Sequence, residues 1–235
     1  MPRLLLPSLL LAASILHAQS PVPAQTETDK RLPAKGGNWG LREAVVTDAS
    51  LPNVLMIGDS ILNGYLAAVE KALAGRATID AWVTPTSQGD KQLPVLLAGM
   101  LGAKKYAVVH FNLGLHGWQK GRIPDGQFEP LTHQMVQAMK RAAPDAKLIW
   151  ATITPVTVKG DPEHLNPEIQ PTIVEHNAMA LKVMKEEGVA VDDLSALMLP
   201  NLKLAAGDMF HWKTEGRDMQ AKAVADAIAK ALPVQ

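Results

Sequence analysis

The 235-residue chain contains no cysteine, so it has no disulfide framework, no thiolate metal site and no cysteine that could carry a lipid anchor. It also has no excess of charge, because 23 Lys and Arg residues balance 23 Asp and Glu residues. This balance gives no indication of a strongly basic surface for nucleic acid or for an anionic membrane. The length is sufficient for one domain with a sizeable core.

Three cofactor and nucleophile motifs are missing. No Gly-x-Gly-x-x-Gly follows the first apolar run, and no Gly-x-x-x-x-Gly-Lys occurs, so we expect neither a dinucleotide nor a bound nucleotide phosphate. The serine in Gly58-Asp59-Ser60-Ile61 is not part of a Gly-x-Ser-x-Gly nucleophile elbow. His110 and His116 have no third ligand at a suitable spacing, which argues against a metal site. We therefore expect no cofactor and no metal.

The chain begins with features typical of a secretory signal peptide. Arg3 gives a basic start, residues 4–16 are largely apolar, and Ala18 is a small residue suited to cleavage. A membrane span requires about 20 apolar residues, and this run is shorter. No other segment of the sequence is long and apolar enough to span a membrane. We expect a signal peptide over residues 1–18, a flexible polar arm over 19–37, one catalytic domain over 38–235, and a periplasmic or secreted protein.

Apolar runs alternate with helical patterns from Asn53 onwards. Strands separated by helices pair in parallel through right-handed crossovers. The sequence therefore predicts an α/β fold, a three-layer α/β/α sandwich with a five-stranded parallel sheet and a flavodoxin-like strand order. The strands are expected at residues 54–57, 77–83, 106–111, 148–153 and 189–191, and the helices at 63–74, 128–143, around Val174 to Met184, and at 213–232.

The first strand runs directly into Gly58, Asp59 and Ser60. Gly58 allows a sharp turn, and Ser60 then falls in the first helical turn, where free backbone N–H groups point outward. A hydroxyl in this position can attack a carbonyl carbon while the N–H groups hold the oxyanion. The alternative is that Asp59 or Ser60 only caps the helix.

A second pattern lies just before the last predicted helix, in Asp208-Met209-Phe210-His211. An aspartate three residues before a histidine can orient the imidazole, which can take the proton of a serine. His211 would be the general base and Asp208 its orienting carboxylate. Packing of the histidine between its aromatic neighbours, and helix capping by Asp208, are the alternatives.

Gly58-Asp59-Ser60 near the start and Asp208-x-x-His211 near the end together resemble the SGNH hydrolases, the GDSL-type esterase family. The resemblance covers roughly residues 53–232. It implies the flavodoxin-like fold, a serine esterase without a cofactor, and an acyl-enzyme intermediate. The substrates that it implies are broad, and include acetylated carbohydrates, short-chain esters, lysophospholipids and thioesters.

The resemblance also implies an oxyanion hole built from the Ser60 N–H, the Gly89 N–H and the Asn112 side chain. Gly89 is similar in position to the glycine of the family's second motif, although it is equally consistent with a plain turn. The third motif departs from the family's Gly-x-Asn-Asp. A gapless overlay places Asn112 on the family's glycine and Gly114 on the family's asparagine. The loop must therefore be built differently if the Asn112 side chain is the oxyanion donor. The alternative is that Asn112 is a turn residue that ends the strand.

Every candidate follows a strand, and ligands of such sheets bind at the carboxyl ends of the strands. His116 and Trp118 follow Asn112 in the same loop. Either could contact substrate, and the Trp118 ring could stack on a sugar, with ordinary loop packing as the alternative for both. His110 alternates into the preceding strand and is expected to be a core histidine whose ring is hydrogen-bonded.

We expect a secreted esterase that removes an O-acetyl group from a carbohydrate, with a small-molecule or carbohydrate ester as partner and no nucleic acid. Two other functions stay open. One is a lysophospholipase or thioesterase of the same fold, and the other is a carbohydrate-binding protein that has lost the chemistry. The sequence gives no indication of the oligomeric state.

Overall fold

The computed structural model describes residues 39–234. The predicted signal peptide and the predicted arm, residues 1–18 and 19–37, lie outside the described residues. No helix within residues 39–234 is both long enough and apolar enough to cross a membrane.

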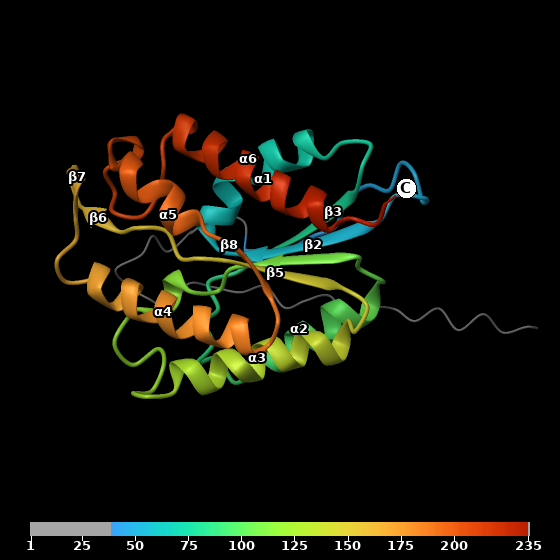
Figure 1. The fold of residues 1–235 in the computed structure, drawn as a ribbon, viewed down its shortest axis with the longest axis horizontal. Helices are drawn as coiled ribbons and strands as arrows, with labels where there is room; N and C mark the ends of the chain where they lie inside the picture. Colours follow the sequence, from blue (N-terminus) through green and yellow to red (C-terminus); the bar gives the residue numbers. More distant parts are fainter. Residues whose placement is uncertain (1–38, 235) are drawn as a thin grey trace, which may run out of the picture.

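A six-stranded sheet forms the middle layer (Figure 1), with the strand order β1-β3-β2-β4-β5-β8. Five of its strands pair in parallel, and counted in chain order their spatial order is 2-1-3-4-5, as in flavodoxin-like folds. The predicted α/β sandwich is therefore confirmed. The strands are β1 (Gly40–Arg42), β2 (Asn53–Gly58), β3 (Thr78–Val83), β4 (Val108–Phe111), β5 (Lys147–Ala151) and β8 (Ala190–Asp192).

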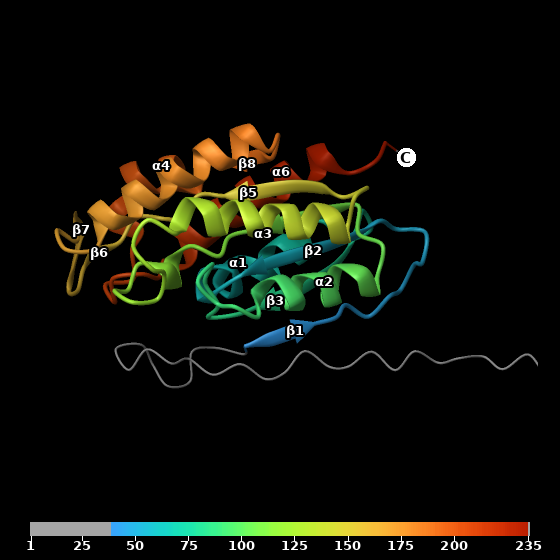
Figure 2. The same cartoon turned by 90° about the horizontal axis from the view of Figure 1, so that it is seen from below.

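The predicted count of five strands is one too few. The sixth strand, β1, pairs antiparallel with β3 at the edge of the sheet, with Leu41 opposite Trp82 (Figure 2). Three residues are too short for an alternating pattern to be recognised, and their strand conformation depends on the hydrogen bonds that β3 offers.

Helices cover both faces of the sheet. Helices α1 and α6 lie on one face with α5, and α2, α3 and α4 lie on the other (Figures 1 and 2). The central strand β2 explains the arrangement, because Val54 and Met56 pack against the first set while Leu55 and Ile57 pack against the second. The α-helices are α1 (Ser60–Ala72), α2 (Leu93–Ala103), α3 (Phe128–Ala142), α4 (Gln170–Glu186), α5 (Leu194–Met198) and α6 (Thr214–Ala231).

Helix α4 lies where it was expected, although Val174, the first residue of the expected range, is not on its buried face. Val174 and Leu181 are 58% and 40% exposed, whereas Ile173 and Val183 are fully buried. Apolar residues stand side by side in this segment, so two neighbouring stripes fit helical spacing and the sequence does not distinguish them.

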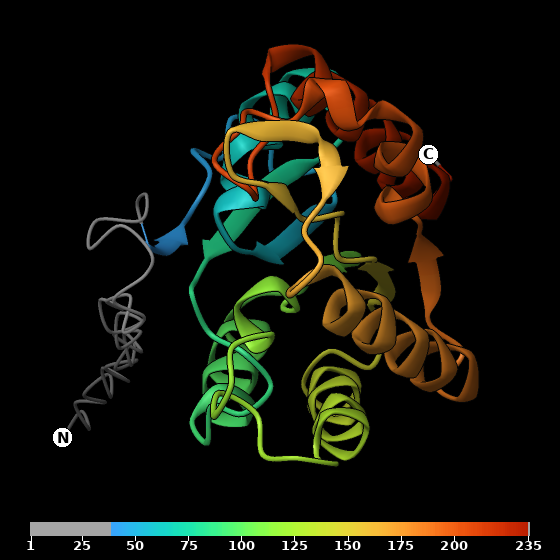
Figure 3. The same cartoon turned by 90° about the vertical axis from the view of Figure 1, so that its left-hand side faces the viewer.

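Three connections contain structure that the sequence did not indicate. The proline-rich loop after β5 forms a small antiparallel hairpin of β6 (Thr157–Val158) and β7 (Asp161–Leu165). The connection between β8 and α6 contains α5 and the 3₁₀ helix η2 (Leu199–Leu204), and a further short 3₁₀ helix, η1 (Leu115–Gly117), follows β4. Figure 3 looks onto the carboxyl edge of the sheet, where the hairpin lies.

Candidate active site

Ser60 is the first residue of α1, directly after the turn that ends β2. Asp59 caps this helix, because its carboxylate accepts a hydrogen bond of 2.8 Å from the Ile61 N–H. Gly58 is needed for close packing, since a Cβ there would lie 2.8 Å from the Leu62 Cβ. The capping role therefore belongs to Asp59, and the Ser60 hydroxyl is engaged elsewhere.

The Ser60 hydroxyl contacts His211. Ser60 Oγ lies 2.8 Å from His211 Nε2, and His211 Nδ1 lies 2.5 Å from Asp208 Oδ2. In a neutral imidazole that donates from Nδ1 to the carboxylate, Nε2 is the acceptor for the serine proton. The structure thus brings together the three side chains that the sequence predicts as nucleophile, base and orienting carboxylate. Such a set can transfer an acyl group.

The Asp208 side chain is hydrogen-bonded to the backbone of its own loop. Asp208 Oδ1 accepts hydrogen bonds from the N–H groups of Phe210, at 3.1 Å, and His211, at 2.9 Å. The hydrogen bond from the His211 ring, together with these N–H groups, lowers the pKa of Asp208 far below its ordinary 3.8 although partial burial opposes this. Asp208 is therefore ionised at neutral pH.

The same hydrogen bond to Asp208 raises the pKa of His211 above its ordinary 6.5. Desolvation by burial lowers this pKa, the negative charges of Asp208 and Asp59 raise it, and the positive charge of Arg217 lowers it. The net effect is a more basic imidazole, which is a better acceptor for the serine proton.

The loops after β3 and β4 are tied to the end of β2. The Thr84 N–H donates to the Gly58 carbonyl and the Asn112 N–H donates to the Ile57 carbonyl, each at 2.8 Å. These bonds bring the segments that carry Gly89 and Asn112 to the edge where Ser60 lies. Gly89 cannot carry a side chain, because a Cβ would lie 2.0 Å from the Arg122 carbonyl oxygen.

The Asn112 side chain is engaged with neighbouring backbone groups. Its Nδ2 donates to the Ala151 carbonyl at 2.7 Å, and its Oδ1 accepts from the Gly114 N–H at 3.1 Å. Such contacts with nearby backbone groups are typical of a turn residue, which is the alternative role of Asn112. They use one of the two Nδ2 hydrogens, so the second is the one that an oxyanion could receive. A side chain at Gly114 would clash with Ile153, so this glycine could not be exchanged for the family's asparagine without rearrangement.

His116 and Trp118 differ in their surroundings. His116 is 5% exposed and its ring lies edge-on to Trp39, with 5.8 Å between centroids, which is loop packing. Trp118 is half-buried, and its ring lies 6.4 Å from that of Phe210, the residue before His211. Trp118 therefore packs beside the loop that carries His211.

His110 and Asp59 also lie near this edge, and the sequence predicts no catalytic role for either. His110 is 1% exposed and its Nε2 lies 3.1 Å from Asp192 Oδ2, so it is a core histidine with a carboxylate partner, as expected. Asp59 was considered only as a cap, but its charge also acts on His211. No group of three or more His, Cys, Asp or Glu side chains in residues 39–234 is arranged to hold a metal ion.

Neither protein-family models nor curated proteins match the chain, but solved structures do. A carbohydrate esterase of family 3 from Talaromyces cellulolyticus is 18% identical, with a TM-score of 0.63, over 78% of this chain and 100% of the other. An acetyl xylan esterase from Geobacillus stearothermophilus is 17% identical, with a TM-score of 0.61, over 78% and 97%. A protein from Parabacteroides merdae named as a GDSL-like lipase is 13% identical, with a TM-score of 0.60, over 77% and 96%. The fold implied by the resemblance to SGNH hydrolases is thus confirmed.

Proposed function

We propose that the protein is a serine esterase of the SGNH type. The observation that carries the proposal is the hydrogen-bonded series Ser60–His211–Asp208, with distances of 2.8 and 2.5 Å, at the carboxyl edge of the sheet. Binding alone does not require a serine, a histidine and an aspartate in this geometry. The similar solved structures include carbohydrate esterases and an acetyl xylan esterase, which supports the same reaction class.

The reaction begins when Ser60 Oγ attacks the carbonyl carbon of the ester and its proton moves to His211 Nε2. The tetrahedral intermediate collapses, the bond to the leaving alcohol breaks, and His211 gives its proton to the departing alkoxide. Water then adds to the acyl-enzyme and transfers a proton to His211. Ser60 leaves with that proton as the carboxylic acid is released. Asp208 keeps the ring oriented and stabilises its charged form throughout.

The oxyanion is held by the Ser60 N–H, the Gly89 N–H and the second Nδ2 hydrogen of Asn112. Ser60 is at the start of α1, where N–H groups lack partners within the helix and carry partial positive charge. Each donor of this kind typically contributes on the order of 2.7–4 kcal/mol to transition-state stabilisation.

The proposed substrate is an O-acetylated carbohydrate. The half-buried Trp118 ring beside Phe210 is suited to stacking on a sugar face, and the similar carbohydrate esterases fit the same class. The predicted signal peptide agrees with a periplasmic or secreted enzyme that meets such polymers, and no step requires a cofactor. His116, which is buried in its loop, is assigned no contact with the substrate.

A lipid or thioester substrate is the second candidate, and the similar GDSL-like lipase favours it. Acyl chain length distinguishes the two, because an acetyl site is too short for long chains. A carbohydrate-binding protein without activity is the third possibility, since the Asn112 loop departs from the family pattern.

The test is hydrolysis of p-nitrophenyl acetate, butyrate and octanoate by the purified mature protein beside Ser60→Ala. We expect activity that is highest on acetate and lost in Ser60→Ala, followed by release of acetate from acetylated xylan. Rates that rise with chain length would move the substrate to lipids. Equal rates in wild type and Ser60→Ala would remove Ser60 as nucleophile.

A further inference from the structure

The β6–β7 hairpin lies against the segment that carries Asp208. In Figure 3 the hairpin lies next to the connection between α5 and α6 at the carboxyl edge of the sheet, and β7 packs on η2. Thr157, at the start of the hairpin, is completely buried, although the hairpin itself is largely exposed. The hairpin is an addition to the sandwich, since its strands do not join the main sheet.

Two backbone hydrogen bonds from the hairpin enclose Asp208. The Thr157 N–H donates to the Met209 carbonyl at 2.9 Å, and the Gly160 N–H donates to the Gly207 carbonyl at 2.9 Å. A longer contact of 3.5 Å joins Thr157 Oγ1 to the same Met209 carbonyl. The residues immediately before and after Asp208 are therefore both fixed from outside the loop.

The loop needs such support because its backbone is strained. Met209 has φ of 94° and is the only residue other than glycine with positive φ among residues 39–234, and Gly207 has φ of 88°. A residue with a Cβ is disfavoured in this region, so isolated loop residues would relax to other conformations. Relaxation would turn the Asp208 carboxylate away from His211.

The hairpin is itself attached to the body of the fold. The Val156 N–H donates to the buried Gln170 side chain at 2.8 Å, and the Asn166 N–H donates to the Val156 carbonyl at 2.9 Å. Gly160 has φ of 79°, which glycine adopts without cost. The support therefore runs from α4 through the hairpin to the catalytic loop.

We propose that the β6–β7 hairpin positions the catalytic loop, with Thr157 and Gly160 as positioning residues that hold the peptide groups on both sides of Asp208. The inference rests on the proposed function, because it assigns the hairpin a role in the geometry of that site. The hairpin acts through Asp208 and His211 and does not contact the reacting atoms.

The pKa of His211 reports this positioning. The charged groups that act on the ring are Asp208 from its own loop, Asp59 from the cap of α1, and Arg217 from α6. Only the Asp208 hydrogen bond depends on the hairpin. Loss of the support should therefore lower the pKa of His211 while the effects of Asp59 and Arg217 remain.

Gly160→Ala tests the proposal, with Gly188→Ala as a matched control. Both glycines have positive φ, 79° and 64°, and a Cβ at either position would meet no atom within 4 Å. Both changes therefore introduce the same backbone strain and no clash. Gly188 follows α4, and its N–H donates to the Lys185 carbonyl and not to the Asp208 loop, so it reports the strain alone.

We expect both variants to lose thermal stability by similar amounts. Only Gly160→Ala should lose at least about tenfold in kcat/KM on p-nitrophenyl acetate, because a small displacement of a catalytic group is enough for such a loss. The acid limb of its pH profile and the His211 pKa from NMR titration should both shift to lower pH. Gly160→Asn, which accepts positive φ more readily, should lie between wild type and Gly160→Ala and carries the test if the alanine variant does not fold.

Equal kcat/KM and an equal His211 pKa in the Gly160 and Gly188 variants would overturn the proposal. The NMR titration does not depend on turnover. A wild-type protein that hydrolyses no ester would therefore overturn the proposed function, while the His211 titration would still decide whether the hairpin positions the loop.

Discussion

His211 Nε2 lies 2.8 Å from Ser60 Oγ although 151 positions separate the two residues in the chain. The contact joins the start of α1 to the loop before α6, and these two helices pack against each other on the same face of the sheet. Tertiary packing of two helices therefore sets the distance between the proposed nucleophile and the proposed base. Each residue is then adjusted locally, Ser60 by the Asp59 cap and His211 by Asp208.

Asp208→Asn should change both the rate and its pH dependence. The pKa of His211 is raised above 6.5, chiefly by Asp208, so the acid limb of kcat/KM in the wild type should have its midpoint above pH 6.5. Activity is lost as the pH falls through this value because a protonated ring cannot accept the serine proton. Asn cannot supply the charge, so the midpoint should move to lower pH and kcat should fall by a factor on the order of 10²–10⁴.

The measurement is a pH–rate profile with p-nitrophenyl acetate. Asp226→Asn is the control, because Asp226 is an exposed carboxylate on α6 that pairs with Lys222. It should leave the profile unchanged. An unchanged acid limb in Asp208→Asn would contradict the assignment of His211 as base.

Met209 gives a comparison that isolates backbone strain. At φ of 94° alanine is strained and glycine is not, so Met209→Gly should be more stable than Met209→Ala by about 1–2 kcal/mol. Both variants lose the same side-chain packing. Thermal unfolding of the two proteins measures the difference in stability. At negative φ a glycine variant is usually less stable than an alanine variant, and the same order here would contradict the strain at Met209.

Asn112→Ala should reduce both activity and stability. If the second Nδ2 hydrogen serves the oxyanion, kcat should fall by a factor on the order of 10²–10³. The melting temperature should fall as well, because the Ala151 carbonyl and the Gly114 N–H lose their partner. Asn177 is the matched control, since its side chain makes the same two kinds of hydrogen bond, at 2.8 and 2.9 Å, to the backbone of Ile153.

Asn177→Ala should lower the melting temperature but keep kcat within a few-fold of wild type when both are assayed well below melting. Equal losses of kcat in the two variants would mean that Asn112 acts only as a turn residue. The comparison therefore separates the two roles considered for this asparagine.

The sequence predicts the parts of the fold that rest on local patterns. The five parallel strands are apolar runs between turn residues, and the Ser60 and His211 motifs fall at strand ends, so their shared edge follows from topology. Strand β1 has no such pattern, because it is short and its pairing depends on β3, which is distant in the chain. The β6–β7 hairpin has none either, because β6 is short and β7 is largely exposed, so no buried apolar alternation marks them. The support of Met209 by Thr157 joins positions 52 residues apart and leaves no mark in the sequence.

Asp59 and Ser60 illustrate a different limit. Both residue types cap helices well, so the sequence alone does not say which of them is the cap. The structure distinguishes them through the bond from the Ile61 N–H to Asp59 and the bond from Ser60 to His211. The position of Asn112 is likewise predictable from the end of β4, whereas the partners of its side chain are not.

Asp80 is a buried carboxylate far from the candidate site, and its removal should be strongly destabilising. It is completely buried in β3 and accepts hydrogen bonds from the Ala44 N–H, Lys104 Nζ and the Tyr106 hydroxyl at 2.8–2.9 Å. Asp80→Ala leaves these donors without a partner, at a cost of about 3–5 kcal/mol. Burial of the Tyr106 side chain raises its pKa, and the charge of Asp80 and the hydrogen bond to it raise it further.

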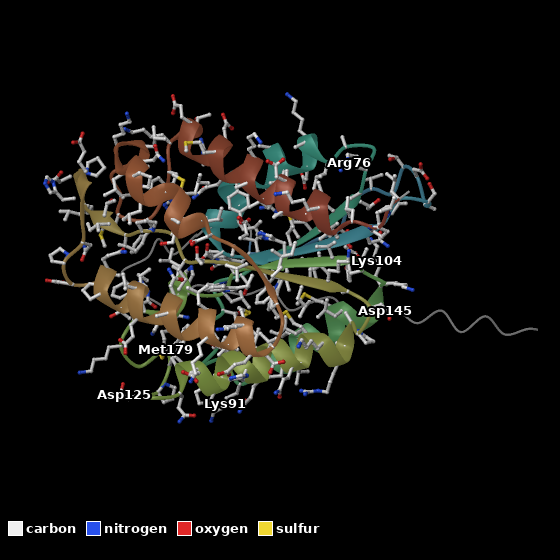
Figure 4. All side chains as sticks on the ribbon, viewed as in Figure 1. Arg76, Lys91, Lys104, Asp125, Asp145 and Met179 are labelled. Carbon is white, nitrogen blue, oxygen red and sulfur yellow. The ribbon has the colours of Figure 1, made fainter. Side chains whose placement is uncertain are left out.

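The control for Asp80 is the exposed pair of Lys105 and Asp145, separated by 3.6 Å at the same end of the molecule; Figure 4 labels Lys104 and Asp145 there. Asp145→Ala should leave the denaturant midpoint almost unchanged, because solvent screens such pairs. Similar midpoints for Asp80→Ala and Asp145→Ala would contradict the structural role of the buried network.

Gln220 is a buried amide whose replacement should stabilise the protein. It is 0% exposed on the inner face of α6, and neither its Nε2 nor its Oε1 has a hydrogen-bond partner in the described chain. Such an amide costs about 1–3 kcal/mol, and methionine keeps the length and flexibility of the side chain without polar atoms. Gln220→Met should therefore raise the melting temperature by roughly 2–4 °C for each kcal/mol regained.

The control is Gln134→Met, at an exposed position of α3, which should change the melting temperature little. A lower melting temperature in Gln220→Met would mean that the amide is bonded, for instance to an internal water.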